Sequence, residues 1–417
     1  MPGLIMLLML VIRILGMRKS PFWWVLIGLM LLIDIYFFQA LQVVCAEATP
    51  LTQIIIFFIY WAISVAAIVI FWALPYIHFK HQDRLSKSTI FSIMAGLFFA
   101  KFLGSLIFLT GDISRIVQLI GGETVARSSV FSWVGIIAGG VLFGLLVYGF
   151  SNKYRYQVKR IKLNYVSLPA AFAGLKIVHI SDIHSGSFTD KEAVLKGVNK
   201  IMEEEPDLIL FTGDMVNNVA DEMKDYMDVF GRLNAPMGVY SVLGNHDYGD
   251  YVQWKSPEEK EANLTSLKKV HHSLGWRLLM NEHVVLEKGD DKIVVIGIEN
   301  WSAKARFPKY GDLKTAYEGS EKHPFKILMS HDPSHWKAEV LESYPDINLM
   351  LAGHTHGMQF GFEIAGFKWS PVQHVYKEWA GLYENAAQKL YINRGFGFLG
   401  YPGRVGILPE ITVLELF

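Results

Sequence analysis

The chain has little cysteine and no excess of charge of either sign. Both features exclude certain kinds of site and certain classes of protein. Its 417 residues include one cysteine, Cys45, so a disulfide framework and a thiolate metal site are excluded. The 39 basic and 39 acidic residues give a formal net charge of +0. That balance argues against a nucleic-acid-binding surface over the whole protein. We find no clear internal repeat and no low-complexity tract.

Hydrophobic residues, in contrast, are abundant and concentrated in the first third of the chain. They make up 52% of the sequence, which is too much for an ordinary soluble enzyme. Four runs are long enough to cross a hydrocarbon layer of about 30 Å at about 1.5 Å per residue. They cover residues 22–43, 53–77, 89–110 and 130–150. A shorter run at 3–16 contains Arg13 and leaves a tilted span, an interfacial helix or a signal-like segment open. Residues 1–150 are therefore predicted to form an all-α transmembrane region of four or five spans.

Two charged residues, Asp34 and Lys101, fall inside predicted spans. Charge within the hydrocarbon is unfavourable and often functional. A transport pathway, however, would need more such residues in a line. Two isolated charges are more typical of helix packing or of side chains that reach the interface, and we interpret them in that way.

The charges of the short loops predict the topology. Loops 17–21 and 78–88 are rich in basic residues, loop 44–51 has none, and loop 111–129 is mixed. The segment after the last span, SNKYRYQVKRIK, is strongly basic. The positive-inside rule then places the C-terminal half in the cytoplasm. The same basic stretch favours contact with anionic lipid headgroups.

The C-terminal half has the pattern of an α/β domain. A basic linker over 151–174, which leads into a short extended segment (VKRIKLNYVSL), is expected to precede a domain that covers 175–417. Within it, strand-length runs that are apolar throughout alternate with charged, helix-like stretches. Such runs are typical of sheets covered on both faces, and these sheets bind ligands at the carboxyl ends of their strands. The main runs are 175–180, 207–212, 238–243, 325–330 and 347–352.

Five short motifs place metal-binding residue types directly after these runs. Carboxylate, imidazole and amide donors without a thiolate suit borderline-hard divalent cations. Two such cations polarise phosphoryl oxygens and generate a hydroxide near neutral pH. The set therefore predicts a two-metal phosphoesterase site. The motifs are SDIH (Asp182, His184), TGD (Asp214), GNHD (Asn245, His246), SHD (His331) and GHTH (His354, His356).

On these motifs, residues 175–417 resemble the calcineurin-like metallophosphoesterase superfamily. The D-x-H, G-D, G-N-H-D, H and G-H-x-H elements match in order and spacing. The resemblance implies a four-layer α/β/β/α sandwich with a dinuclear metal centre. SDIHSG, GNHDYG, MNEHVVL, GHTHG and the late RGFG are similar to a bacterial subgroup of membrane-associated phosphodiesterases. Some related membrane-bound members cleave the pyrophosphate of UDP-diacylglucosamine. The N-terminal spans lie outside the resemblance.

The resemblance also assigns the ligands of the two metals, with one carboxylate bridging them. Either Mn²⁺, Fe or Zn²⁺ suits such a donor set. The first metal is assigned to Asp182, His184, Asp214 and His356, and the second to Asp214, Asn245, His331 and His354.

Three further residues are candidates beside the metals. His246 is expected to lie by the substrate, where an imidazole stabilises or protonates the leaving oxygen. Asp247 is expected to orient His246. Arg394, in YINRGFG, is either a phosphate clamp or part of a structural ion pair.

The predicted function is a membrane-anchored, dinuclear metal-dependent phosphoesterase of the bacterial inner membrane, with its catalytic domain in the cytoplasm. It would hydrolyse a phosphodiester or pyrophosphate bond, in a membrane lipid such as UDP-diacylglucosamine. One alternative is a phosphodiesterase or phosphatase for soluble nucleotides or phosphoproteins, with the spans as an anchor only. Another is a membrane sensor or transporter whose phosphoesterase domain is not catalytic, and the complete set of ligands argues against it.

Overall fold

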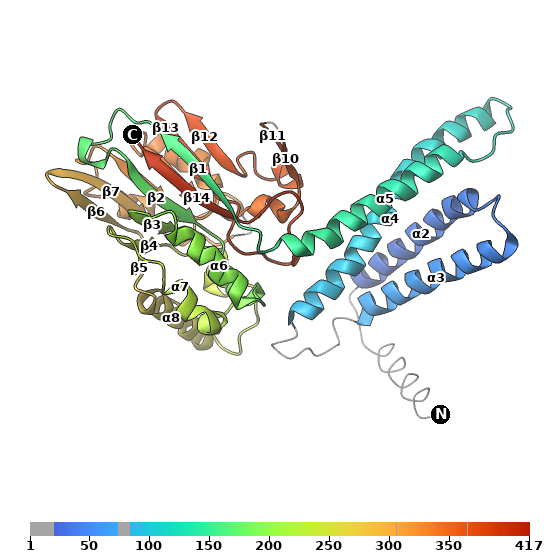
Figure 1. The fold of residues 1–417 in the computed structure, drawn as a ribbon, viewed down its shortest axis with the longest axis horizontal. Helices are drawn as coiled ribbons and strands as arrows, with labels where there is room; N and C mark the ends of the chain where they lie inside the picture. Colours follow the sequence, from blue (N-terminus) through green and yellow to red (C-terminus); the bar gives the residue numbers. More distant parts are fainter. Residues whose placement is uncertain (1–20, 74–83, 306, 365) are drawn as a thin grey trace. The chain divides into compact units, whose positions relative to one another are not determined.

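The computed structural model describes residues 21–73, 84–305, 307–364 and 366–417. The chain separates into two compact units, Met1–Tyr148 and Gly149–Phe417, which are described here one at a time (Figure 1). The short run at 3–16 lies outside the described residues, as does the end of the run predicted over 53–77.

The described part of the first unit consists of four long helices. Each of them is long and apolar enough to cross a membrane. The third is longer than the run predicted at 89–110, so Asp112 and Arg115 lie on a helix and not in a loop. The helices are α2 (Pro21–Val44), α3 (Pro50–Ala73), α4 (Arg84–Ile120) and α5 (Ser129–Gly149).

The charges inside the spans are paired with each other. Lys101 on α4 donates a hydrogen bond to Asp34 on α2, and both are buried. Ser64 and Tyr60 on α3 donate to the same Asp34 oxygen at 2.9 and 3.1 Å. The pair joins three helices through satisfied polar groups, as an intramembrane charge requires. This arrangement agrees with the interpretation of Asp34 and Lys101 as packing residues.

The second unit is built on two six-stranded mixed sheets (Figure 1). The first has the order β1-β14-β2-β3-β4-β5 and the second β12-β13-β9-β8-β7-β6. The strands of the first sheet are β1 (Gln157–Leu163), β2 (Leu175–Ile180), β3 (Leu208–Phe211), β4 (Val239–Ser241), β5 (Arg277–Leu278) and β14 (Glu410–Leu416). Those of the second are β6 (Glu282–Lys288), β7 (Asp291–Gly297), β8 (Lys326–Met329), β9 (Leu349–Ala352), β12 (Gly381–Asn385) and β13 (Gln388–Ile392).

The two sheets pack face to face and carry helices on their outer faces. Their shared core includes Ile177 and Leu210 from the first sheet and Val295 and Leu351 from the second. Outside the first sheet, α8 (Pro257–Ser273) packs near β3, with α6 (Lys191–Met202) and α7 (Met227–Phe230) on the same unit. Outside the second sheet, α9 (Leu313–Tyr317) and residues 336–340 contribute to another apolar core. This is the predicted α/β/β/α sandwich, and it explains why the central strands are apolar throughout.

The segment predicted as a linker over 151–174 contributes a strand to the sandwich. β1 pairs in parallel with β14 from Gln157↔Glu410 to Leu163↔Leu416. It is an edge strand, and most of its side chains are exposed or half-buried. Charged side chains are a common protection of sheet edges, which is why this strand resembles a basic linker in the sequence.

The strands that precede the motifs run in parallel within each sheet. In the first sheet β2, β3 and β4 are parallel neighbours, and in the second β7, β8 and β9 are. The carboxyl ends of parallel neighbours meet at one edge. The motif loops after β2, β3 and β4 therefore meet in the first sheet and those after β8 and β9 in the second. Face-to-face packing brings the two sets together, and the N–H of His354 donates to Asp182 at 3.1 Å.

Candidate metal centre

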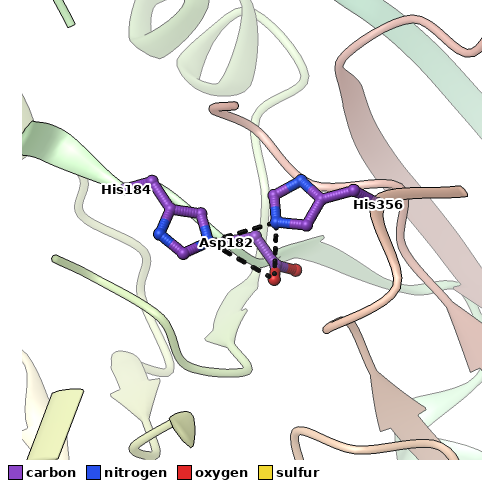
Figure 2. Close-up of side chains that lie close together, drawn as sticks. All are labelled: Asp182, His184 and His356. Atoms are coloured by element: carbon purple, nitrogen blue, oxygen red, sulfur yellow. Dashed lines mark hydrogen bonds and ion pairs between the residues drawn. The ribbon is translucent and has the colours of Figure 1, made fainter. Parts of the chain in front are cut away.

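Two groups of potential ligands form at this edge of the sandwich. The ligand atoms of Asp182, His184 and His356 all lie within 4.8 Å of one another, and Figure 2 shows the two imidazole rings converging on the carboxylate. The Nε2 atom of His356 is 3.2 Å from Oδ1 of Asp182 and 3.1 Å from Nε2 of His184. These three side chains are buried.

The second group consists of Asp214, His331 and His354, whose ligand atoms also lie within 4.8 Å of one another. The Oδ2 atom of Asp214 is 3.2 Å from Nε2 of His331. The same oxygen is 3.5 Å from Nε2 of His184, which belongs to the first group. Asp214 thus faces both groups, which is the position that a bridging carboxylate needs.

The backbone at these positions is strained. A left-handed conformation raises the energy of a residue other than glycine by about 1–3 kcal/mol, and such residues cluster at functional sites. Here it occurs directly after the strands, where the chain must turn sharply. The candidate ligands with positive φ are Asp182 (54°), His184 (48°), Asp214 (60°), His354 (71°) and His356 (50°).

Whether these residues suit a metal can be judged from the donor atoms that hydrogen bonds leave available. The amide nitrogen of Asn245 donates to Tyr251 at 2.8 Å, while its buried Oδ1 has no hydrogen-bond partner among the described residues. An orphaned buried acceptor is unfavourable unless something else satisfies it. The Nδ1 atom of His331 donates to the carbonyl of Thr212 at 2.7 Å, which leaves Nε2 for a ligand bond. The residues therefore fit divalent cations.

The electrostatics of the site agree with that fit. Burial lowers the pKa of His184 to about 3, so its ring is neutral and can bind a metal. Burial alone would also lower the pKa of His331, but the neighbouring Asp214 carboxylate raises it to about 10. In the protein without a cation, a proton on His331 thus supplies part of the positive charge that Asp214 needs.

His246 lies beside the two groups and belongs to neither. Its ring centroid is 5.0 Å from that of His184. Its backbone N–H donates to Oδ1 of Asp214 at 2.8 Å, and its Nδ1 lies 2.8 Å from the carbonyl oxygen of Asn217. The carbonyl fixes the ring and leaves Nε2 for contact with a bound molecule.

Asp247 was expected to orient His246, and the hydrogen bonds found for its carboxylate among the described residues go instead to backbone N–H groups. Its two carboxylate oxygens accept hydrogen bonds from the backbone N–H groups of Asp214 (2.9 Å), Met215 (2.8 Å), Val216 (3.2 Å) and Gly244 (2.9 Å). The side chain is buried, and these four donors account for its position. Asp247 therefore shapes the loop that presents Asp214.

Arg394 forms buried ion pairs, which favour the structural role over the phosphate clamp. Its guanidinium is buried and contacts two carboxylates. Nε and Nη2 donate to Oε1 of Glu363 at 2.7 and 2.5 Å, and Nη1 donates to Glu410. A group held in this way has little capacity left for a substrate phosphate.

Two residues at the site have no motif that would have identified them. The hydroxyl of Tyr376 lies 2.9 Å from Nε2 of His354 and donates to Oδ2 of Asp332 at 3.1 Å. The fully buried Arg404 places Nη2 3.3 Å from Nδ1 of His356. Each thus holds one imidazole of the GHTH motif. Asp332 directly follows His331 in SHD, so a local pattern marks that residue but neither Tyr376 nor Arg404.

Comparison with known families agrees with this geometry. Residues 175–358 match the model of the calcineurin-like phosphoesterase family. Residues 17–153 match a second model, described as the transmembrane domain of a probable calcineurin-like phosphoesterase. The membrane region, which the resemblance in the sequence did not cover, thus has a family of its own.

Relatives are found in vertebrates and bacteria. A transmembrane protein with a metallophosphoesterase domain from Danio rerio is 28% identical over 74% of this chain and 69% of its own length. The uncharacterized metallophosphoesterase YkuE of Bacillus subtilis is 29% identical over 68% of this chain and 94% of its own length. The UDP-2,3-diacylglucosamine pyrophosphatase LpxG of Chlamydia muridarum is 28% identical over 55% of this chain and 81% of its own length. The second half of the chain is therefore a calcineurin-like metallophosphoesterase domain, a phosphoester hydrolase, and it follows an N-terminal transmembrane domain of four apolar helices.

Proposed function

We propose that the protein hydrolyses a phosphodiester or pyrophosphate bond with two divalent cations at the membrane surface. The observation that carries this proposal is the position of Asp214, which faces both groups of potential ligands. The ligands would be Asp182, His184, Asp214 and His356 for one cation and Asp214, Asn245, His331 and His354 for the other. Bound there, the cations would polarise the phosphoryl group and supply a hydroxide nucleophile. Mn²⁺, Fe and Zn²⁺ all suit this donor set.

The residues around the cations have separate roles in this proposal. His246, fixed by the carbonyl of Asn217, holds or donates a proton through Nε2 at the leaving oxygen. Asp247 keeps the Asp214 loop in place through four backbone hydrogen bonds. Tyr376 and Arg404 orient His354 and His356, and such partners fix which ring nitrogen faces a metal.

The proposed substrate is amphiphilic, with a nucleoside diphosphate lipid such as UDP-diacylglucosamine as the first candidate. The support is the pyrophosphatase among the relatives and the four spans, which keep the enzyme in the same bilayer as a lipid. We further propose that the catalytic domain, residues 175–417, faces the cytoplasm at a bacterial inner membrane. That orientation is supported by the alternation of basic and base-poor loops.

A comparison of matched substrates tests the proposal. The full-length protein in detergent micelles would be assayed with Mn²⁺ against bis-p-nitrophenyl phosphate, nucleotides, a lipid pyrophosphate and the deacylated form of that lipid. We expect cleavage of the simple diester and a clear preference for the acylated pyrophosphate. Equal or faster cleavage of the deacylated form would reject the lipid substrate but not the hydrolase. No cleavage of any of them, with both metals bound, would reject the hydrolase.

A further inference from the structure

A short ribbon outside the two large sheets presents an apolar face. β10 (Phe362–Ile364) and β11 (Phe367–Trp369) pair with each other in antiparallel fashion (Figure 1). The register pairs Phe362 with Trp369 and Ile364 with Phe367. Side chains alternate along a strand, so these four share one face. The ring of Phe362 lies 5.8 Å from that of Phe367 and 5.7 Å from that of Trp369.

This apolar face is open to its surroundings. The exposed fractions are 40% for Phe362, 69% for Ile364 and 63% for Phe367. Single exposed apolar residues are normal on a protein surface, whereas a contiguous cluster marks a site of interaction. Three large exposed side chains on a ribbon of this size form such a cluster.

The opposite face of the ribbon fixes it to the catalytic unit. Glu363 accepts hydrogen bonds from Arg394 at 2.7 Å and from Lys159 at 2.6 Å. Lys368, which pairs with Glu363 across the ribbon, donates to the hydroxyl of Tyr383 at 3.0 Å. The polar side is therefore held by ion pairs and hydrogen bonds, which leaves the apolar side for a partner.

The base of the ribbon is joined to the first residue of the second unit, which directly follows the last span in the chain. The N–H of Gly361 donates to the carbonyl of Val405 at 2.9 Å, and Gln359 donates through its side chain to the carbonyl of Tyr401 at 2.8 Å. The N–H of Arg404 in the same loop donates to the carbonyl of Gly149, the last residue of α5, at 2.9 Å. Loop 401–405 thus binds both the base of the ribbon and Gly149, at which the second unit begins.

We propose that the apolar face of the β10–β11 ribbon docks into the interfacial layer of the bilayer that the chain spans. Strands of this length extend about 10 Å at about 3.3 Å per residue, so the ribbon cannot reach far from loop 401–405. Aromatic side chains favour the membrane interface. The ribbon follows residues 356–359, which include His356, so docking holds the metal centre at the level of the headgroups. This inference deepens the proposed function, because it explains how a site on a folded domain meets a lipid phosphate.

Site-directed spin labelling tests the docking without relying on activity. The single cysteine allows a background with Cys45→Ser, into which Ile364→Cys is introduced. Val166→Cys provides the control, because Val166 is fully exposed on the same unit. Single copies of the full-length protein would be placed in nanodiscs of phosphatidylcholine and phosphatidylglycerol. Collision rates of each label with oxygen and with a water-soluble nickel chelate would then be measured.

Docking predicts that the label at residue 364 has a several-fold lower collision rate with nickel and a higher one with oxygen than the label at residue 166. Equal nickel collision rates at the two positions would overturn the proposal. Shielding that arises only after a lipid pyrophosphate is added would also overturn it, because the ribbon would then hold the substrate's acyl chains.

A variant with Phe362→Ser, Ile364→Ser and Phe367→Ser gives an independent measurement. We expect unchanged cleavage of bis-p-nitrophenyl phosphate, since none of these residues is in the metal centre. Cleavage of a lipid pyrophosphate embedded in nanodiscs is expected to fall several-fold. An unchanged rate on the embedded lipid would contradict docking, and the simple diester reports separately whether the hydrolase itself is intact.

Discussion

The carboxylate of Asp247 accepts a hydrogen bond from the backbone N–H of Asp214 at 2.9 Å, so the GNHD motif shapes the loop of the GD motif. We predict that Asp247→Asn destabilises this loop, because an amide replaces one acceptor oxygen with a donor that faces backbone N–H groups. An unsatisfied buried group costs about 1–3 kcal/mol. The melting temperature and the number of bound metals per chain should both decrease. An unchanged melting temperature would contradict this role.

His246 and Asp214 should respond differently to substitution. His246→Ala is expected to keep both metals and to lower turnover by about 10²–10⁴-fold, because the ring acts on the leaving group. Asp214→Asn is expected to lose both metals, because a bridging carboxylate neutralises two cations. Metal analysis after dialysis against Mn²⁺, combined with single-turnover rates, checks the pair. Equal loss of metal in the two variants would exclude the separation of roles.

Tyr376→Phe should weaken the second metal site selectively. The substitution removes the hydroxyl that contacts Nε2 of His354 and Asp332 while it keeps the ring. Loss of such a partner typically lowers metal affinity by about 10–100-fold. Tyr317→Phe is a matched control, because that hydroxyl donates to Asp346 away from the site. Titration with Mn²⁺ should show weaker binding in the first variant only, and equal binding would show that Tyr376 has no positioning role.

Substitution of Arg394 can distinguish a role in a structural ion pair from a role in substrate binding. Arg394→Met would leave the fully buried Glu410 without its cationic partner, although Tyr391 and Thr412 still donate to it, and breaking a buried ion pair costs about 3–5 kcal/mol. We expect a lower melting temperature with an unchanged KM. The double variant with Glu410→Gln should recover part of the stability. A raised KM at unchanged melting temperature would instead support the interpretation of Arg394 as a phosphate clamp.

The candidate metal ligands were more predictable from the sequence than the residues that hold them in place. The motifs follow strands whose apolar character marks them as central. Parallel pairing within each sheet then brings Asp182 close to Asp214 and His331 close to His354, whereas the meeting of the two sets depends on how the sheets pack. Tyr376 and Arg404 come from loops that fold back on the site, and no local pattern marks such residues. The same limit applies to β1, because the sequence indicates an extended segment there but not that it pairs with β14 at the edge of the first sheet. Asp112 is predicted in a loop but lies on α4, and its pairing with Arg127, which follows the helix, cannot be read from the local sequence.

Acid should destabilise the catalytic unit through His271, which is buried on α8. Burial lowers the pKa of this imidazole from 6.5 to about 3. The unfolded chain therefore takes up the proton as the pH falls below about 6.5, while the folded protein resists it until about 3. The stability linked to this group is complete above pH 6.5 and is lost progressively as the pH falls, by about 3 kcal/mol between pH 7 and pH 4. His271→Gln should give a melting temperature that changes less over this range, whereas the same substitution at the exposed neighbour His272 should leave the slope unchanged. Equal slopes for His271→Gln and the unsubstituted protein would show that the buried imidazole does not control acid stability.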